Sequence, residues 1–286
     1  MCRIFGFRSV LFSQVHSSLV SADNALVNQS TRHPDGWGVA YYIGQTPHLI
    51  KSTQSAIDCH IFQKISGVVS SQSVVAHVRN ATEGELSILN THPFQYGKWV
   101  FAHNGNIKNL AKHKDKLLAL ISPEIKRFIL GDTDSEIIFF ILLSQIKKRT
   151  CLESPTITNQ EFSDLIRNGL QSIVDLIGKL TDDDAGLPTE NYLTFVLTNG
   201  SYMFGVQAGQ PLYYSTYKNY CPERDTCANF NDTCENLTTT GAINHLILSS
   251  EPLQGENIWI KLLPGEFVSV DDNMNLFKDQ YILPFN

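Results

Sequence analysis

The sequence predicts a layered α/β fold that forms a single domain over residues 1–286. Two observations support this prediction. Short runs rich in β-branched and aromatic residues lie toward both ends of the chain, and segments with helical spacing of apolar residues lie between them. A chain of 286 residues with 42% hydrophobic and 10% aromatic content can also bury a substantial core.

The first two thirds of the chain combine predicted strands with predicted helices. The helix expected at 134–147 places Ile137 and Ile141 on one face, and the helix expected at 14–29 does the same with Val15 and Leu19. The expected strands are 3–9, 37–43, 74–79 and 99–105, and the expected helices are 14–29, 107–120, 134–147 and 160–180.

The last third is predicted to be mostly strands. An Asp-rich loop at 182–188 marks the change, and the segment 219–240, rich in Asn, Thr and Cys, predicts a long surface insertion. The expected strands are 192–198, 200–206, 245–249, 258–263 and 265–270.

The composition argues against several classes of function. A net charge of −6 with no stripe of Lys or Arg argues against a nucleic-acid surface. No run approaches the ~18 apolar residues of a membrane helix, and the apolar run at 10–12 is too short for a secretory signal. Although the chain has five glycosylation sequons, the one at Asn80 lies within a candidate pocket motif, so we expect a reducing, cytoplasmic setting.

Cys2 is the first residue with candidate chemistry. If Met1 is removed, Cys2 carries both a thiol and a free α-amine. The thiolate is a nucleophile, and an α-amine with a pKa of roughly 7.7–8.0 can accept a proton near neutral pH. One residue would then supply nucleophile and base together. The alternative is a small buried thiol at the start of a strand.

The pair Asn104-Gly105 follows an apolar strand-forming run. A side-chain amide and a glycine N–H can converge on one oxygen, which is the donor pair that an oxyanion hole needs. An ordinary Asn-Gly hairpin turn is the alternative interpretation.

Arg79 and Asp134 are candidates for binding a charged substrate. Arg79 ends an apolar strand, where its guanidinium can hold a carboxylate through two hydrogen bonds, or alternatively form a strand-end ion pair. Asp134 precedes an apolar helix, where Asp132, Thr133 or Asp134 could instead be the N-cap. Together, an arginine and an aspartate can recognise the carboxylate and ammonium groups of an amino acid.

The segment 35–38 reads Asp-Gly-Trp-Gly, with Gly36 and Gly38 on either side of Trp37. Flexible backbone around a large aromatic side chain suits a wall or lid beside a pocket. A tight turn that enters a strand explains the same residues equally well.

Metal binding is the weaker interpretation of the histidines and clustered cysteines. His77, His92 and His103 lie on separate segments without ligand spacing, so we expect them to be hydrogen-bonded core or supporting residues. Cys221, Cys227 and Cys234 could bind zinc together with His245. Their spacing lacks a Cys-x2-Cys knuckle, so free thiols are the default expectation. We expect neither a metal nor another cofactor.

Taken together, these residues resemble the class II glutamine amidotransferases, which are N-terminal nucleophile hydrolases. The similarity is to the stand-alone branch, which includes the bacterial γ-glutamyl hydrolase of the ergothioneine pathway and the fungal subunit that cleaves glutathione. The resemblance implies a four-layer αββα sandwich of two stacked, mostly antiparallel sheets. It rests on Cys2 and on segments 35–38, 76–84, 90–94, 102–106 and 131–136.

The resemblance also implies roles for matching positions. Cys2 would be the nucleophile, and Asn104 and Gly105 would form the oxyanion hole. Arg79 would bind the α-carboxylate of a γ-glutamyl group, and Asp134 its α-ammonium. The residues that we also expect against the substrate are Gly36, Trp37, Thr82 and His92.

The leaving group is left open by the sequence. Synthase-linked family members carry Trp and His where this chain has Asn80 and Glu83. The activity expected is therefore cleavage of the γ-glutamyl amide of glutamine or of a γ-glutamyl compound. One alternative is a γ-glutamyl peptide hydrolase that does not use free glutamine, and another is a non-catalytic regulatory subunit. Delivery of ammonia to an acceptor would need a separate synthase subunit.

Overall fold

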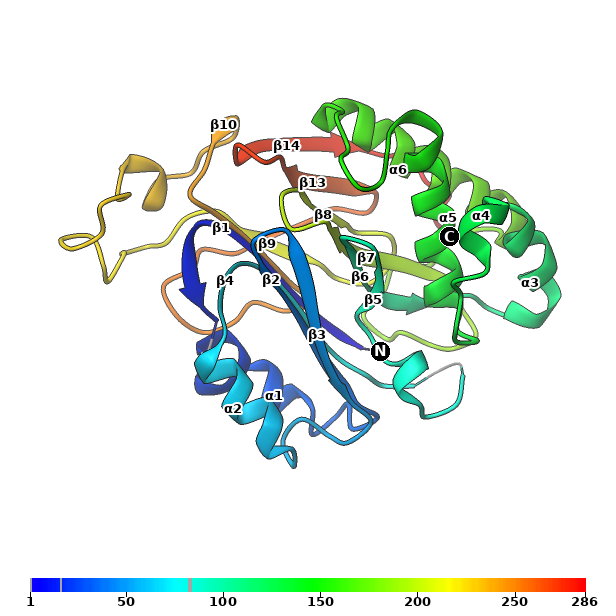
Figure 1. The fold of residues 1–286 in the computed structure, drawn as a ribbon, viewed down its shortest axis with the longest axis horizontal. Helices are drawn as coiled ribbons and strands as arrows, with labels where there is room; N and C mark the ends of the chain where they lie inside the picture. The colour runs from blue at the N-terminus through cyan, green and yellow to red at the C-terminus, as the bar shows by residue number, and fades with distance from the viewer. Residues whose placement is uncertain (1, 16, 82–83) are drawn as a thin grey trace.

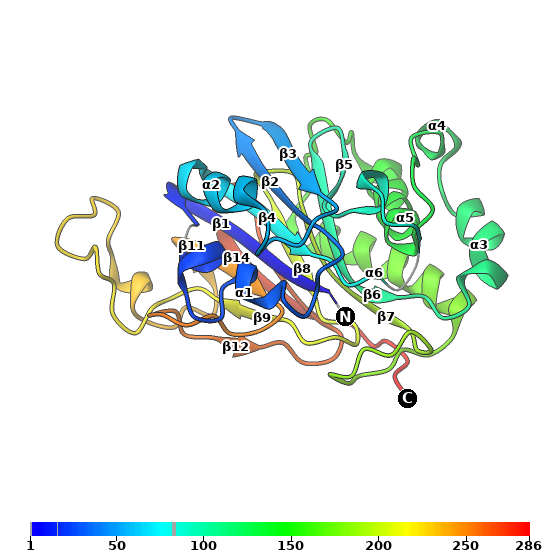
Figure 2. The same cartoon turned by 90° about the horizontal axis from the view of Figure 1, so that it is seen from below.

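A computed structural model describes residues 2–15, 17–81 and 84–286. Two seven-stranded sheets stack face to face, with helices on both outer faces (Figures 1 and 2). Helices α1 (Leu26–Gln29) and α2 (His60–Val68) cover one sheet, while α5 (Asp134–Arg149) and α6 (Asn159–Ile177) cover the other. The four-layer αββα sandwich is thus confirmed.

The first sheet has β1 at its centre, so the segment that follows Cys2 is flanked by strands on both sides. All pairings within both sheets run antiparallel over the described residues. In spatial order the strands are β12 (Ile260–Lys261), β9 (Tyr213–Ser215), β11 (His245–Ser249), β1 (Arg3–Gln14), β4 (Ser70–Val78), β2 (Trp37–Ile43) and β3 (Thr46–Ser52).

The second sheet carries β6, the strand of Asn104 and Gly105, next to its edge. In spatial order its strands are β10 (Gly241–Ala242), β14 (Asn275–Gln280), β13 (Glu266–Val270), β8 (Met203–Val206), β7 (Tyr192–Thr198), β6 (Trp99–Asn106) and β5 (Phe94–Tyr96).

Three buried apolar clusters separate the four layers. The cluster between the sheets includes Ile4, Ala102 and Val196. The sheets pack closely here, since a Cβ on Gly6 would lie 3.1 Å from Val196 Cγ1. The other two clusters lie between each sheet and its helices. Burial of these apolar surfaces is the main force that holds the layers together.

The long helices have clear sequence signals. Helix α5 is apolar on most sides and is buried over most of its length, with Thr133 as its N-cap and the basic residues 147–149 in its last turn. Helix α6 starts with a capping box between Thr158 and Glu161. The structure thus identifies Thr133, among the three candidates, as the N-cap.

Two predicted helices differ from the structure. The single helix expected at 14–29 is replaced by a π-helical turn at Ser17–Ser21 and the short α1. Asn24 donates a side-chain hydrogen bond to Pro252 O between these turns, so it competes with helical backbone bonding. Helix α3 (Leu110–Ala119) begins later than expected, because Asn109 has a φ of 54°.

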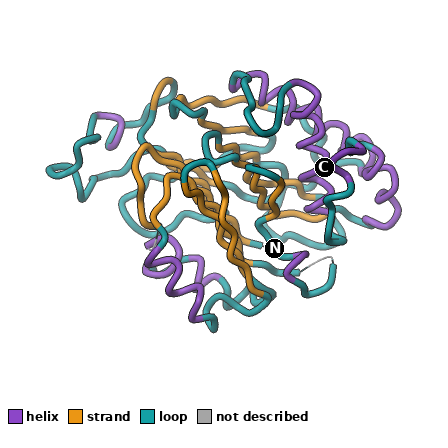
Figure 3. The backbone as a smooth tube through the Cα atoms, viewed as in Figure 1, coloured by secondary structure: helices purple, strands orange, loops and turns teal. Residues whose placement is uncertain are grey.

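The segment 219–240 projects from the sandwich as an extended loop (Figures 1 and 3). It contains a single 3-10 turn, Asp232–Cys234, and is tied to the body by backbone hydrogen bonds such as Asn219 N to Glu256 O at 2.7 Å. Of the helices described, none has the length and apolar character that crossing a membrane requires.

Candidate active site

Cys2 lies immediately before β1 and lines a small cavity at one end of the stacked sheets. Its Sγ is 3.3 Å from the backbone N of Asn80 and 3.4 Å from the Asn80 carbonyl oxygen. The side chains brought together are drawn from both sheets and from the start of α5. The lining residues are Cys2, Arg79, Asn80, Ala81, Asn90, His92, His103, Gly105, Thr133, Asp134 and Ser135.

The segment that contacts the sulfur is held by the Asp35-Gly36 turn. Gly36 O accepts a hydrogen bond from Arg79 N at 2.8 Å, and Asp35 Oδ2 accepts one from Ala81 N at 2.8 Å. Gly36 has a φ of 122°, and an added Cβ would lie 2.7 Å from Ser52 O. A glycine is therefore required here for the backbone to support Arg79 and Asn80.

Arg79 is 3% exposed and places its guanidinium at the cavity. Its Nη1 donates to Glu85 O at 3.3 Å. This bond attaches the loop that follows Asn80 to the end of β4, while the guanidinium still lines the cavity. A buried, planar cation of this kind suits a substrate carboxylate.

Asp134 is 3% exposed and is the first residue of α5. Its Oδ1 accepts a hydrogen bond from Ser135 N and its Oδ2 one from Ile107 N, each at 2.7 Å. The carboxylate is therefore fixed by backbone donors of two separate segments. Because each carboxylate oxygen can accept more than one hydrogen bond, Asp134 can still receive a substrate ammonium.

Asn104 and Gly105 do not form a turn. Both are paired within β6, opposite Thr194 and Leu193 of β7. Successive side chains of a strand point to opposite faces. The Asn104 side chain is 1% exposed, and its Oδ1 has no hydrogen-bond partner among the described residues.

Gly105 lines the cavity from the same strand. A Cβ at this position would lie 2.0 Å from His103 Nε2 and 2.1 Å from Tyr192 O. No side chain fits here, so a glycine is required at this position of the cavity wall.

Three buried histidines support the cavity. The His77 and His92 rings stack at 4.2 Å between centroids, and His103 Nδ1 lies 2.9 Å from Ser135 Oγ. Burial lowers the pKa of His77 to about 3, and it also lowers the pKa values of His92 and His103. All three rings are therefore neutral near pH 7. Both ring nitrogens of His92 lack partners within the described chain.

The histidine and cysteine groups show no arrangement suited to a metal. Over residues 2–15, 17–81 and 84–286, no cluster of three or more His, Cys, Asp or Glu side chains is placed to bind a metal ion. Cys221, Cys227 and Cys234 are free thiols.

Gly36 and Trp37, both expected against the substrate, and Asn104, expected in the oxyanion hole, are not among the described residues that line the cavity. Trp37 is fully buried in the core between the first sheet and its helices, where its ring meets Phe62 edge-on at 5.0 Å. It belongs to the core because β2 directs it toward α2. Thr82 lies outside the described residues.

Sequence reasoning assigned no role to several residues that the structure brings to the cavity. Asn90 links two loops, since its Nδ2 lies 2.6 Å from Asp132 Oδ1 and 3.1 Å from Glu85 O. Ser135 contacts both Asp134 and His103. Both lie within segments 90–94 and 131–136, on which the family resemblance rests, but no chemistry was predicted at these two positions.

A family model described as class-II glutamine amidotransferases matches residues 1–279. The chain is 34% identical over 176 residues to a putative glutamine amidotransferase of Haemophilus influenzae, which covers 60% of this chain and 51% of that protein. It is 32% identical over 222 residues to the probable glutamine amidotransferase DUG3 of Saccharomyces cerevisiae, with 70% and 62% covered. The chain thus spans about half to three fifths of these two relatives.

Solved structures with low sequence identity show the fold. A glutamine aminotransferase class-II domain protein from Silicibacter pomeroyi superposes with a TM-score of 0.63 at 17% identity, with both chains fully covered. The glutamine phosphoribosylpyrophosphate amidotransferase of Bacillus subtilis gives a TM-score of 0.60 at 17% identity. It covers all of this chain and 50% of that one. These two structures therefore share the fold of this chain.

Proposed function

Since this chain belongs to the class II glutamine amidotransferases, we propose that it is an amidohydrolase that cleaves a γ-glutamyl amide through a thioester on Cys2. The observation that supports this most directly is that Cys2, Arg79 and Asp134 line one cavity. A nucleophile, a buried cation and a buried anion thus meet at one place. The substrate is glutamine or another γ-glutamyl compound.

In this proposal the two charged side chains orient the substrate. The Arg79 guanidinium binds the α-carboxylate of the γ-glutamyl group through paired hydrogen bonds. Asp134, held by Ile107 N and Ser135 N, binds the α-ammonium. With both charged groups on the α-carbon held in place, the γ-carbonyl carbon at the other end of the γ-glutamyl group can be presented to Cys2 Sγ. His92, with its unpartnered ring nitrogens, is assigned to the wall of the substrate pocket.

The chemical steps follow from this placement. The thiol proton passes to the free α-amine of Cys2 once Met1 has been removed, and Sγ attacks the γ-carbonyl carbon. Asn104 and Gly105 stabilise the oxyanion that develops on the carbonyl oxygen. The α-ammonium then protonates the departing amine or ammonia, which leaves a thioester. Water then adds to the thioester carbon and gives a proton to the α-amine of Cys2. Glutamate and the free Cys2 thiol are released.

Burial of Cys2 explains why a base is needed. Burial raises the pKa of the Cys2 thiol, while the hydrogen bond with Asn80 and the charge of Arg79 oppose that rise. The net direction is upward, so the resting sulfur is a thiol near neutral pH. An α-amine within the same residue is a short route for its proton.

The identity of the leaving group is the open part of the proposal. Asn80 holds the sulfur only through its backbone, so its side chain is free to contact the leaving group. A second candidate function is hydrolysis of γ-glutamyl peptides or amides other than glutamine. A similarity of 35% identity over 72 residues to the γ-glutamyl-hercynylcysteine sulfoxide hydrolase of Mycobacterium tuberculosis favours it. That match covers 25% of this chain and 31% of that protein.

The test is a substrate panel offered to protein from which Met1 has been removed. Glutamine, γ-glutamyl dipeptides and γ-glutamyl alkylamides are incubated with wild type and with Cys2→Ala, and the release of glutamate is measured. We expect release from at least one compound by wild type and none by the variant. Preference for glutamine identifies a glutaminase, and preference for peptides identifies the second candidate. If wild type hydrolyses no member and a thiol-directed glutamine analogue leaves Cys2 unlabelled, the proposal is wrong.

A further inference from the structure

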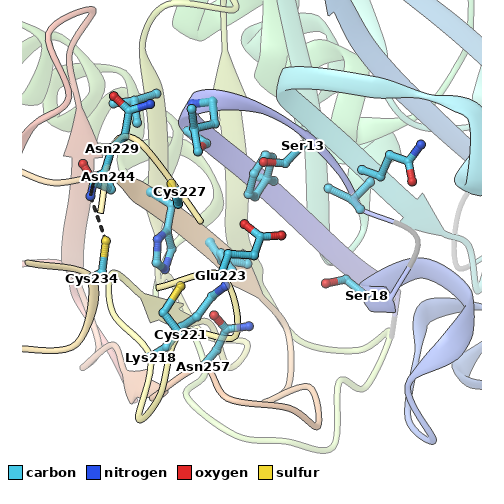
Figure 4. Close-up of a pocket in the computed structure, with 18 residues that line it drawn as sticks. Ser13, Ser18, Lys218, Cys221, Glu223, Cys227, Asn229, Cys234, Asn244 and Asn257 are labelled. Atoms are coloured by element: carbon cyan, nitrogen blue, oxygen red, sulfur yellow. Dashed lines mark hydrogen bonds between the residues drawn. The ribbon is translucent and has the colours of Figure 1, made fainter. Parts of the chain in front are cut away.

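A second cavity, of about 230 Å³, lies beneath the projecting segment and is separate from the Cys2 site (Figure 4). One wall is the later half of β1, from Phe7 to Gln14. The other wall comes from the segment that carries Lys218, Cys221 and Cys234, together with His245 of β11.

The walls of this cavity are held in place by specific hydrogen bonds. Lys218 N donates to Cys234 O at 2.8 Å, so the residue that precedes the projecting segment is joined to a residue within it. Asn244 Nδ2 lies 2.9 Å from Cys234 Sγ and 3.1 Å from Asn229 O. The cavity therefore has a defined shape, although it lies under an extended loop.

Two buried polar atoms at the cavity have no partner. His245 Nε2 and Asn257 Oδ1 are both inaccessible and make no hydrogen bond with any described residue. A buried polar atom without a partner costs free energy, so such atoms are normally satisfied by a ligand or by ordered water. Burial and the nearby Lys218 lower the pKa of His245 to about 4, so its ring is neutral near pH 7.

Two opposite charges complete the lining. Lys218 is partly buried and Glu223 is exposed at the rim. Neither side chain takes part in an ion pair with another described residue. Figure 4 shows the Glu223 carboxylate extended toward β1, above Cys221. One cation and one anion on the same small cavity give it no net preference for anions or for cations.

We propose that this cavity binds a small zwitterion of amino-acid or dipeptide size. Lys218 binds the carboxylate of the ligand and Glu223 its ammonium. The volume of about 230 Å³ admits a ligand of this size and excludes a nucleotide or a folded partner. A simple anion such as phosphate would leave Glu223 opposed to it.

The site is distinct from the one that holds the γ-glutamyl group. Cys2 precedes β1, whereas the cavity wall reaches Ser13 at the far end of the same strand. The residue of this wall nearest to Cys2 in the sequence is Phe7, five residues away, which at about 3.3 Å per residue is roughly 17 Å. A ligand bound here therefore does not touch the Cys2 sulfur, and the inference is independent of the proposed function.

The cysteines provide a local readout of binding. Cys227 is partly buried at the cavity, and Cys151 is exposed elsewhere, so alkylation by iodoacetamide can be followed at both by mass spectrometry. L-alanine, L-methionine and glycylglycine are the zwitterionic probes, with propionate and ethylamine as singly charged controls. We expect at least one zwitterion to slow alkylation of Cys227 by about tenfold at saturation while Cys151 reacts unchanged. Propionate and ethylamine, which carry one charge each, should not slow the alkylation of Cys227.

Variants test the two charges. Lys218→Gln and Glu223→Gln should each weaken binding of the zwitterion, measured by calorimetry, by about five- to tenfold. Lys112→Gln, on the exposed face of α3, is the matched control and should bind like wild type. The proposal is overturned if no zwitterion protects Cys227, if propionate or ethylamine protects it as well, or if both charge variants bind like wild type.

Discussion

The Cys2 sulfur and the backbone of Asn80 form a reciprocal contact, with Sγ 3.3 Å from Asn80 N and 3.4 Å from Asn80 O. Arg79 is the preceding residue, and Ala81, the next one, is bonded to Asp35. The nucleophile and the guanidinium are therefore attached to one short, fixed segment. This geometry sets the distance between the attacking atom and the group proposed to hold the substrate carboxylate.

Replacement of Cys2 by alanine should abolish both turnover and thioester formation, because no other described residue that lines the cavity is a comparable nucleophile. Intact-mass spectrometry with a thiol-directed glutamine analogue measures this directly. Cys151→Ser is the control, since the Cys151 thiol is exposed and lies outside the cavity. The Cys151→Ser protein should be labelled at Cys2 as wild type is. Equal labelling of the Cys2→Ala protein would place the nucleophile elsewhere.

Replacement of Asn104 by alanine should lower kcat by about 10²–10³-fold with little loss of stability. The side chain is buried and its Oδ1 makes no hydrogen bond within the described chain, so its removal leaves no protein donor to that oxygen unsatisfied. Asn106→Ala is the matched change on the same strand. Its Nδ2 bonds to Pro188 O at 2.8 Å and to Glu190 O at 3.0 Å, so we expect lower Tm and a smaller effect on kcat. Wild-type kcat in the Asn104 variant would remove that residue from the mechanism.

The parts of the fold that sequence reasoning predicted have strong local signals. Strands β2 and β7 are runs of aromatic and β-branched residues, and α5 follows Thr133 with a long apolar run. Strand β3 was missed because its residues, Thr46–Ser52, include Pro47, His48 and Lys51, which are uncommon in predicted strands. Its pairing with β2 is a tertiary effect that one segment alone does not reveal.

The candidate site likewise contains residues that have a local sequence signal and residues that only the tertiary structure brings together. Cys2, Arg79, Gly105 and Asp134 were named from the sequence, and the structure brings them to one cavity. Trp37 was expected at the pocket, yet it lies in the core, because a Gly-Trp-Gly pattern does not reveal the face of the sheet to which the ring points. Asn90 was predicted only as part of segment 90–94, without a role, since its two bonds reach residues 5 and 42 positions away in the chain.

Replacement of Gly105 by alanine should destabilise the protein by about 2–3 kcal/mol and abolish turnover, because the new Cβ has no room. It would lie 2.0 Å from His103 Nε2 and 2.1 Å from Tyr192 O. Gly44→Ala is the control. Its φ of 58° makes alanine cost about 1–2 kcal/mol through the backbone alone, but nothing lies within 4 Å of the new atom. Chemical denaturation of both variants measures the difference, and equal losses would show that space at residue 105 is not limiting.

The buried histidines should make the protein lose stability on acidification. Burial lowers the pKa of His77 to about 3 in the folded protein, whereas an unfolded histidine has a pKa of about 6.5. Between these two values the unfolded chain binds more protons than the folded one, so the free energy of unfolding falls as the pH decreases from about 6.5 toward 3. The pKa of His92, stacked on His77, shifts in the same direction and adds to the effect.

Denaturant titrations at a series of pH values test this, with His77→Gln as the variant. Glutamine preserves a donor for the bond that His77 Nε2 makes to His103 O at 3.3 Å, but it does not titrate. We expect a shallower decline of stability below pH 6.5 in the variant than in wild type. His48→Gln is the control, because His48 lies on the edge strand β3, stacked on Tyr41 away from the cavity, and should leave the slope unchanged. A variant slope equal to that of wild type would mean that His77 does not titrate on unfolding, and therefore that its ring is not held neutral in the native protein.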